Sequence, residues 1–140
     1  LSAAEMSKVL NKKSGFLGIS GISSDNRDIE AASKEGNERA KLVGEMLNYE
    51  IKKYIGSYMA AVQGADAIVF TAGIGENDTQ ACADVIKGFE WMGIKIDPAK
   101  NVRGCCGIIS TDDSTVKVLR IPTNEELPIA RDTLEIVSNL

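Results

Sequence analysis

The sequence of 140 residues contains no histidine, and this absence excludes more chemistry than any other feature of its composition. Without an imidazole, the chain by itself has no histidine-dependent acid–base, nucleophilic or zinc chemistry. Cysteine is also scarce, because Cys82, Cys105 and Cys106 are an odd number without the C-x-x-C spacing of soft metal sites. We interpret them as buried or loop thiols, and nothing in the pattern supports a redox role for the neighbouring pair.

The chain also lacks an excess of positive charge and any long apolar run. Its net charge of -4 argues against binding to nucleic acid or to a membrane surface. There is no run of about 18 apolar residues and no charged-then-apolar leader, so neither a membrane span nor a signal peptide is predicted, and the cytoplasm is the expected compartment. The hydrophobic content of 44% is ordinary for a globular domain.

What the sequence does have is an apolar run, Ala67–Phe70, that stops in a glycine turn. The absence of polar alternation suits a strand covered on both faces of a parallel sheet. Gly73–Asn77, called here the glycine segment, allows positive φ and a close approach of a ligand to the backbone. Asn77 or Asp78 can cap the following helix, whose exposed amides favour an anion. The pattern therefore suggests a phosphate-binding turn, with a tight strand-to-helix turn that binds nothing as the alternative.

Two common phosphate-binding motifs do not fit this turn. A dinucleotide fingerprint needs a third glycine at the position of Asp78, and a P-loop needs a Lys-Ser/Thr pair that is missing. The string Phe70-Thr71-Ala72-Gly73-Ile74-Gly75-Glu76-Asn77 instead resembles the signature of acetate kinases, which belong to the actin/Hsp70/sugar-kinase superfamily. Three further stretches agree with the resemblance in order and approximate spacing: Lys12–Gly21, Ser23–Asp28 and Ile121–Glu126.

The resemblance covers essentially the whole chain but only the last third or so of such an enzyme. It implies an α/β fold, part of a ribonuclease-H-like (actin-like ATPase) domain with a short parallel sheet and covering helices. Residues 1–140 would be a single unit, the carboxy-terminal part of the second acetate kinase domain, and the three-stranded meander that opens such a domain would lie before Leu1. The reaction implied is reversible, Mg²⁺-dependent phosphoryl transfer from ATP to acetate, giving acetyl phosphate and ADP.

The resemblance also assigns roles to residues. The adenosine contact falls on Asp25, Asn26 and Arg27; the phosphate contact falls on Gly73, Ile74, Gly75, Glu76 and Asn77; and the magnesium position falls on Glu125. The catalytic groups and the acetate pocket belong to upstream sequence, so no catalytic residue is expected here and the chain alone is expected to be inactive. A homodimer is implied, because acetate kinases associate through this half of the molecule. The alternatives are a propionate or butyrate kinase and a non-catalytic dimerisation module.

The residue types by themselves leave blander interpretations open. Asp25 can be a helix cap with Arg27 in a surface ion pair. Glu125 can be a partner of a helix dipole, and Thr123 with Glu126 fits a capping box. In favour of a ligand site, carboxylates beside a phosphate call for a cation such as Mg²⁺, which prefers oxygen ligands. Because ligands bind at the carboxyl ends of parallel strands, the glycine segment and Glu125 are expected to face one crevice.

Periodicity predicts the remaining elements. Ser2 and Glu5 form a capping box for a helix through about Leu10. The other predicted elements are an extended segment or loop at Gly15–Gly21, helices at about Asp28–Gln63 with a break near Gly36 and around Cys82–Phe89, core residues Trp91, Met92 and Ile94, a short strand at Ile108–Ile109, a second parallel strand at Val116–Ile121, and a final helix with Leu127, Ala130, Leu134 and Val137. The long helix carries an apolar stripe, from Ala40 to Val62, that is either core or a subunit contact.

Overall fold

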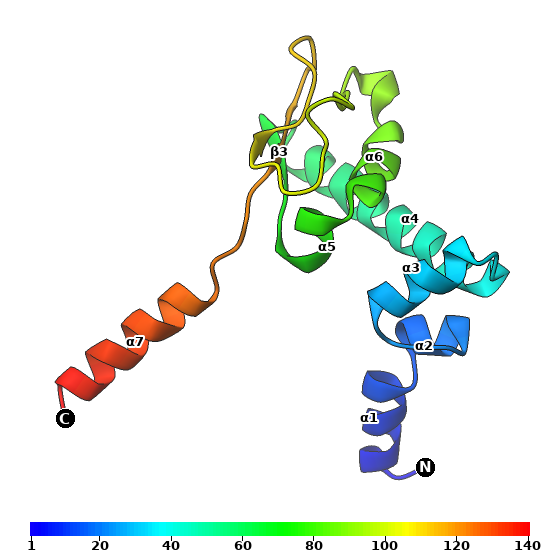
Figure 1. The fold of residues 1–140 in the computed structure, drawn as a ribbon, viewed down its shortest axis with the longest axis vertical. Helices are drawn as coiled ribbons and strands as arrows, with labels where there is room; N and C mark the ends of the chain where they lie inside the picture. Colours follow the sequence, from blue (N-terminus) through cyan, green and yellow to red (C-terminus); the bar gives the residue numbers. More distant parts are fainter. The chain divides into compact units, whose positions relative to one another are not determined.

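The computed structural model describes residues 1–140 and divides into two compact units, Leu1–Ala61 and Val62–Leu140 (Figure 1). The first unit is helical and contains α1 (Ala3–Lys12), α2 (Gly15–Ser20), α3 (Asn26–Lys34) and α4 (Glu38–Ala61). The second contains β1 (Ala67–Phe70), α5 (Ala72–Asn77), α6 (Thr79–Lys87), the 3-10 turn η1 (Glu90–Met92), β2 (Gly107–Ile108), β3 (Lys117–Arg120) and α7 (Glu126–Ser138). The mixed α/β class is confirmed, whereas the assignment of residues 1–140 to one unit of a larger domain stays a prediction.

Local capping defines the helices of the first unit. The predicted capping box is present at α1, where the Ser2 hydroxyl accepts from the Glu5 amide at 3.3 Å and the Glu5 carboxylate accepts from the Ser2 amide at 2.6 Å. The break predicted near Gly36 is also present, between α3 and α4. Gly36 takes a positive φ of 90°, and the Asn37 side chain then accepts from the amide of Ala40 at 3.0 Å at the start of α4.

The prediction of an extended segment or loop at Gly15–Gly21 is wrong, because Gly15–Ser20 form α2. The glycines conceal a helical pattern in which Phe16 and Ile19, three residues apart, share one face. Both pack against the buried core of the unit, formed by Ile29, Ala40 and Val43. Burial of that face outweighs the low helix propensity of glycine, and Gly21, with φ of 71°, ends the helix.

The long helix α4 is confirmed, but its apolar stripe is buried only in part. Ala40 and Val43 near its start are fully buried, whereas Tyr54 and Tyr58 are 54% and 64% exposed. The second half of the stripe is therefore not core within this chain. Whether it forms a subunit contact stays a prediction.

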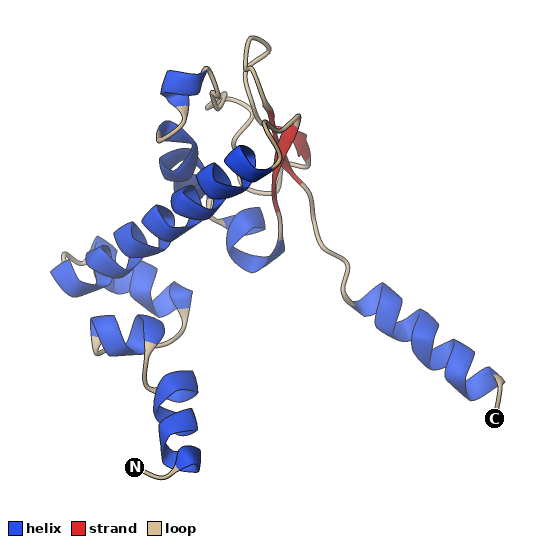
Figure 2. Ribbon diagram, turned by 180° about the vertical axis from the view of Figure 1, so that it is seen from behind, coloured by secondary structure: helices blue, strands red, loops and turns tan.

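The second unit is built on a three-stranded sheet, whose strands are red in Figure 2. The strand order is β1-β3-β2. The predicted parallel pair is confirmed, with Ala67 opposite Lys117 and Phe70 opposite Arg120. The short strand predicted at Ile108–Ile109 is present at Gly107–Ile108, and it runs antiparallel to β3. The expectation that β1 is covered on both faces is wrong for this chain, because Ile68 is buried while Val69 is 48% exposed.

Side chains of α6 form much of the core beside this sheet. Cys82, Val85, Ile86 and Phe89 are buried as predicted. The prediction that Trp91 and Met92 are also core is wrong, since they are 82% and 37% exposed. They lie in η1, which ends at Gly93 with φ of 80°, and this turn directs Ile94 into the core instead.

The final helix is present as α7, yet none of its residues is buried. Every residue from Ile121 to Leu140 is exposed, including its large apolar side chains. The apolar positions that predicted the helix therefore have no covering surface in this chain. No helix in the structure has the length and apolar character needed to cross a bilayer.

Candidate functional site

The glycine segment is helical, which differs from the turn expected from the sequence. Ala72–Asn77 form α5, a helix of six residues, and neither Gly73 nor Gly75 has a positive φ. The residue that takes the left-handed conformation is Ala72, with φ of 58°. Of the two predicted caps, Asp78 is the correct one: its carboxylate accepts from the Ala81 amide at 2.8 Å at the start of α6.

The two glycines of this segment have different surroundings. A Cβ built on Gly75 would lie 3.1 Å from the backbone carbonyl carbon of Phe70, so a side chain there would crowd the Phe70 backbone. A Cβ built on Gly73 would meet nothing within 4 Å. Packing within the chain thus explains glycine at position 75 but not at position 73. The open space beside Gly73 is where a ligand can approach the backbone.

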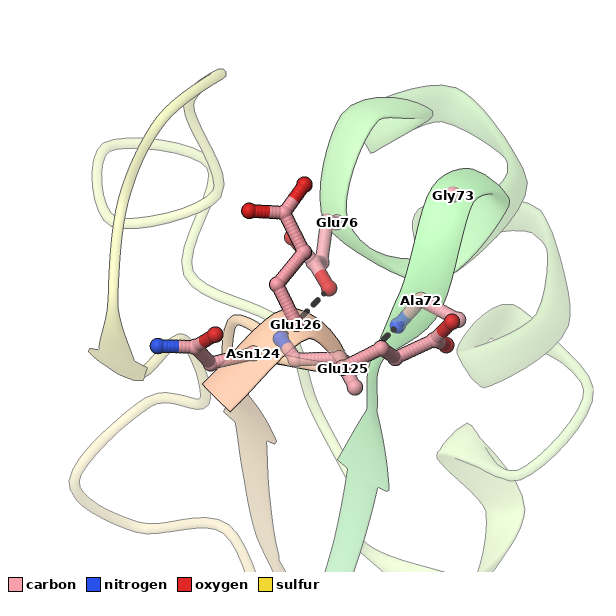
Figure 3. Close-up of a pocket in the computed structure, with 7 residues that line it drawn as sticks. Ala72, Gly73, Glu76, Asn124, Glu125 and Glu126 are labelled. Carbon is pink, nitrogen blue, oxygen red and sulfur yellow. Dashed lines mark hydrogen bonds between the residues drawn. The ribbon is translucent and has the colours of Figure 1, made fainter. Parts of the chain in front are cut away.

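Thr123 ties the residues that follow the two parallel strands to each other. Its hydroxyl lies 2.5 Å from the Thr71 hydroxyl and accepts from the Ala72 amide at 3.1 Å. Its own amide donates to Glu76 Oε1 at 2.7 Å. The dashed lines at the labelled residues Ala72 and Glu76 in Figure 3 mark these two hydrogen bonds. The segment that follows β3 is thereby fixed against both ends of α5.

The capping box predicted from Thr123 and Glu126 is wrong, because the threonine side chain is used in these long-range contacts. Asn124 serves the final helix instead, its side chain accepting from the Leu127 amide at 3.1 Å. The role of Thr123 was missed in the sequence, although one signal was available. Thr71 and Thr123 each follow a strand of a parallel pair, and hydroxyls at the two carboxyl ends are placed to meet.

A pocket of about 390 Å³ opens where these segments meet. It is lined by Ala72, Gly73, Glu76, Thr123, Asn124, Glu125 and Glu126 (Figure 3). The crevice expected between the glycine segment and Glu125 is therefore present. The structure brings together Gly73, Glu76 and Glu125 of the predicted site residues. Ile74, Gly75 and Asn77 do not line the pocket, and the Asn77 amide group donates to the Gly73 carbonyl at 2.9 Å.

Three carboxylates line the pocket, those of Glu76, Glu125 and Glu126. Of its three carboxylates, Glu76 is partly engaged by the Thr123 amide, whereas no protein donor engages the carboxylates of Glu125 and Glu126. No three acidic or cysteine side chains converge into a complete set of metal ligands. This arrangement fits Mg²⁺, which is bound through one or two carboxylates together with substrate oxygens and retained waters.

The predicted adenosine residues lie in the first unit and form a helix cap. Asp25 accepts from the Arg27 amide at 2.8 Å and pairs with the Arg27 guanidinium at 2.6 Å. Hydrogen bonds from the side chain and backbone of Arg27 lower the pKa of Asp25 to about 2. The alternative interpretation, in which Asp25 caps a helix and Arg27 forms a surface ion pair with it, is thus present in the structure. The Arg27 side chain remains 89% exposed, and Asn26 is the first residue of α3.

Sequence reasoning missed Arg120, the last residue of β3. Its side chain is fully buried and makes four polar contacts. Nε donates to Gly75 O at 3.1 Å, Nη1 donates to Val102 O at 2.9 Å and lies 3.2 Å from Cys105 Sγ, and Nη2 donates to Asn101 Oδ1 at 2.7 Å. An arginine in a short strand gives no local signal that its guanidinium is buried, because its acceptors lie 15 to 45 residues away in the chain.

Comparisons with known proteins agree with the resemblance. The model of the acetokinase family matches residues 1–131. An acetate kinase of Clostridium botulinum (strain Loch Maree / Type A3) is 56% identical over 139 residues, which is 99% of this chain. The chain also superposes on the crystal structure of Porphyromonas gingivalis acetate kinase with a TM-score of 0.87 and 50% identity, covering 98% of this chain and 35% of that one.

A second similar structure is that of a kinase with a different acyl substrate. The crystal structure of a propionate kinase from Francisella tularensis subsp. tularensis SCHU S4 matches with a TM-score of 0.83 and 37% identity, over 94% of this chain and 33% of that one. The chain spans 35% of the length of the Clostridium relative. The comparisons therefore describe one part of longer proteins.

Proposed function

This chain belongs to the acetokinase family, and on that premise we propose that it is the nucleotide-binding, carboxy-terminal part of an acetate kinase. The whole enzyme would transfer a phosphoryl group reversibly between ATP and acetate, giving acetyl phosphate and ADP. Its location in the cytoplasm and its assembly as a homodimer are further proposals that the family resemblance supports. The catalytic groups and the acetate pocket lie outside these residues in our proposal, so the 140 residues alone form no acetyl phosphate.

The observation that carries this proposal is the pocket at the carboxyl ends of β1 and β3. Ligands of open α/β sheets bind at this position. Gly73 offers backbone with open space beside it, and Glu125 offers a carboxylate across the same pocket. A polyphosphate held against Gly73 and a cation held by Glu125 are chemically complementary.

Phosphoryl transfer requires chiefly that the reacting groups are positioned and that phosphate charge is neutralised. In our proposal Gly73 and Glu76 border the phosphates, and Ile74, Gly75 and Asn77 act through the backbone of the same short helix. Bound Mg²⁺ would offset the negative charge of the phosphates. Glu125, with Glu126 beside it, would supply the protein ligand. The adenosine contact of Asp25, Asn26 and Arg27 rests on the family resemblance alone.

Substitution of Gly73 by valine in the full-length enzyme tests the phosphate assignment. The added side chain would enter the open space that we assign to the phosphates, so MgADP affinity and acetyl phosphate synthesis should both fall by at least about tenfold. The matched control is Gly44→Val in α4, a second helical glycine whose Cβ would meet nothing within 4 Å. Calorimetric titration with MgADP measures the affinity. If Gly73→Val folds and binds MgADP as tightly as the wild type does, the phosphate assignment is wrong.

The competing proposal is that the acyl substrate is propionate instead of acetate, because the similar Francisella structure is that of a propionate kinase. The acyl pocket would lie outside this chain. The ratio of kcat/KM for acetate to that for propionate, measured on the full-length enzyme, decides between the two substrates. A value above one supports acetate.

A non-catalytic dimerisation module is the proposal from another class. The exposed tyrosines of α4, Tyr54 and Tyr58, are the observation that favours it. Retained dimerisation without any MgADP binding in the full-length protein would establish this alternative. Binding of MgADP would exclude it as the whole function.

A further inference from the structure

Arg120 is a buried cation whose partners are all neutral. It is fully buried, it forms no ion pair with a carboxylate, and its hydrogen bonds reach two carbonyls, one amide oxygen and one thiol sulfur. Arginine is almost never fully buried without a paired charge, because removing it from water is costly. The hydrogen bonds of all three guanidinium nitrogens offset this cost in part, and they fix the side chain in one orientation.

One of these bonds is made to the glycine segment itself. Gly75 lies in the last turn of α5, where a helix leaves its carbonyl groups without intrahelical donors. Arg120 Nε supplies a donor to this carbonyl at 3.1 Å, and the Cys82 thiol supplies a weaker one at 3.5 Å. Burial raises the pKa of the Cys82 thiol, and the Arg120 guanidinium opposes this rise only in part, so the thiol keeps the proton that it donates.

The other side of the guanidinium anchors the junction between α5 and α6. Nη2 donates to Asn101 Oδ1 at 2.7 Å, and the Asn101 side chain in turn donates to Thr79 O at 2.9 Å. Gly75 and Thr79 lie on the two sides of Asp78, which separates the two helices. Arg120 and Asn101 therefore hold both sides of this junction through a single chain of hydrogen bonds.

We propose that Arg120 is a positioning residue for nucleotide binding: its guanidinium fork fixes the Gly75 carbonyl and thereby sets the orientation of the pocket-lining residues Gly73 and Glu76. This inference rests on the proposed function, because it assigns Arg120 to the same pocket. Arg120 does not line the pocket and acts only through the backbone of α5. A lysine would keep the positive charge but has no fork, so it cannot bond the four acceptor atoms in the same geometry.

The test compares Arg120→Lys with Val118→Ala in the full-length enzyme. Val118 is equally buried and lies two positions earlier in β3, and its side chain makes no hydrogen bond to the glycine segment. We expect Arg120→Lys to raise the Kd for MgADP and the KM for ATP about tenfold, and to leave the KM for acetate within twofold. Val118→Ala should lower the melting temperature and leave the MgADP affinity unchanged. Amide NMR shifts of Gly73 and Glu76 should move only in Arg120→Lys.

A second variant covers a failure of Arg120→Lys to fold. Asn101→Ala removes one acceptor of the fork and leaves the guanidinium in place, and it should weaken MgADP binding in the same direction by a smaller factor. The positioning role is overturned if Arg120→Lys or, where that variant is unfolded, Asn101→Ala binds MgADP within twofold of the wild type. It is also overturned if Val118→Ala weakens binding equally. Absence of MgADP binding by the wild type would instead refute the proposed function on which the inference rests.

Discussion

The two glycines of α5 allow stability and ligand binding to be separated by a single methyl group. Gly73 and Gly75 both have helical backbone conformations, so alanine is free of backbone strain at either position. A Cβ at Gly73 has open space around it, whereas a Cβ at Gly75 lies 3.1 Å from the Phe70 carbonyl carbon and 3.4 Å from its Cα and Cβ. Alanine should therefore have opposite effects on the free energy of unfolding at the two positions.

The magnitudes follow from helix propensity and packing. Replacing glycine by alanine in a helix stabilises it by about 0.8–1.0 kcal/mol. Gly73→Ala should gain about this amount, since nothing opposes it. Gly75→Ala gains the same propensity but forces an overpacked contact against backbone that costs about 1–3 kcal/mol, so its net loss is about 1 kcal/mol. The two variants should differ in free energy of unfolding by about 2 kcal/mol.

The effect of Gly73→Ala on nucleotide affinity should be opposite to its effect on stability. In Gly73→Ala the new methyl group occupies the space assigned to the phosphates, so MgADP affinity should fall by about tenfold or more although the protein is more stable. Urea unfolding of the nucleotide-free, full-length protein measures the first quantity, and calorimetric titration measures the second. A Gly73→Ala variant that is destabilised, or that binds MgADP normally, would refute the reasoning for this position.

Two further predictions concern the carboxylates. Glu125→Gln should raise the Mg²⁺ concentration for half-maximal activity by at least about tenfold, while the control Glu135→Gln, exposed in the helix α7 that Glu125 precedes, should leave it unchanged; equal values for the two variants would contradict the magnesium assignment. The pKa of Asp25 is lowered to about 2 by its bonds from Arg27. The pKa of Asp25 in the folded state is lower than its value near 4 in the unfolded chain, so the ionised carboxylate stabilises the folded protein at pH values above about 4. This contribution is lost as the pH falls from about 4 toward 2. Carboxyl NMR of the folded protein measures this pKa, with Asp25→Asn as the assignment control, and a midpoint near 4 would contradict the pairing.

The parts of the fold that depend on local pattern were predictable. The capping box of Ser2 and Glu5, the break at Gly36, the apolar strand Ala67–Phe70 and the spacing from Cys82 to Phe89 all act within a few residues, and each is present in the structure. The meeting of the glycine segment with Glu125 was also predictable. It follows from the rule that parallel strands bring their carboxyl ends to one edge of a sheet.

The parts that were not predictable depend on contacts between distant residues. Arg120 bonds to the Gly75 carbonyl, 45 positions away, and Thr123 bonds to Thr71 and Ala72 across the pocket. Trp91 was predicted to be core together with Met92 and Ile94, yet the turn at Gly93 decides which side chain enters the interior. A single sequence carries no local sign of these contacts, since they depend on which distant segment of the chain packs beside each residue.

The open edge of β1 has a consequence for how the chain associates with other polypeptides. β1 is hydrogen-bonded to β3 and is the outer strand of its sheet, so backbone donors and acceptors along its other side have no strand partner. Such an edge can add a further strand from any polypeptide of suitable sequence, including a second copy of this chain. The four residues of β1 can therefore pair with a strand of another polypeptide, which extends the sheet, or with β1 of a second copy of this chain, which is self-association. The relative concentrations of the other polypeptide and of this chain decide which pairing occurs.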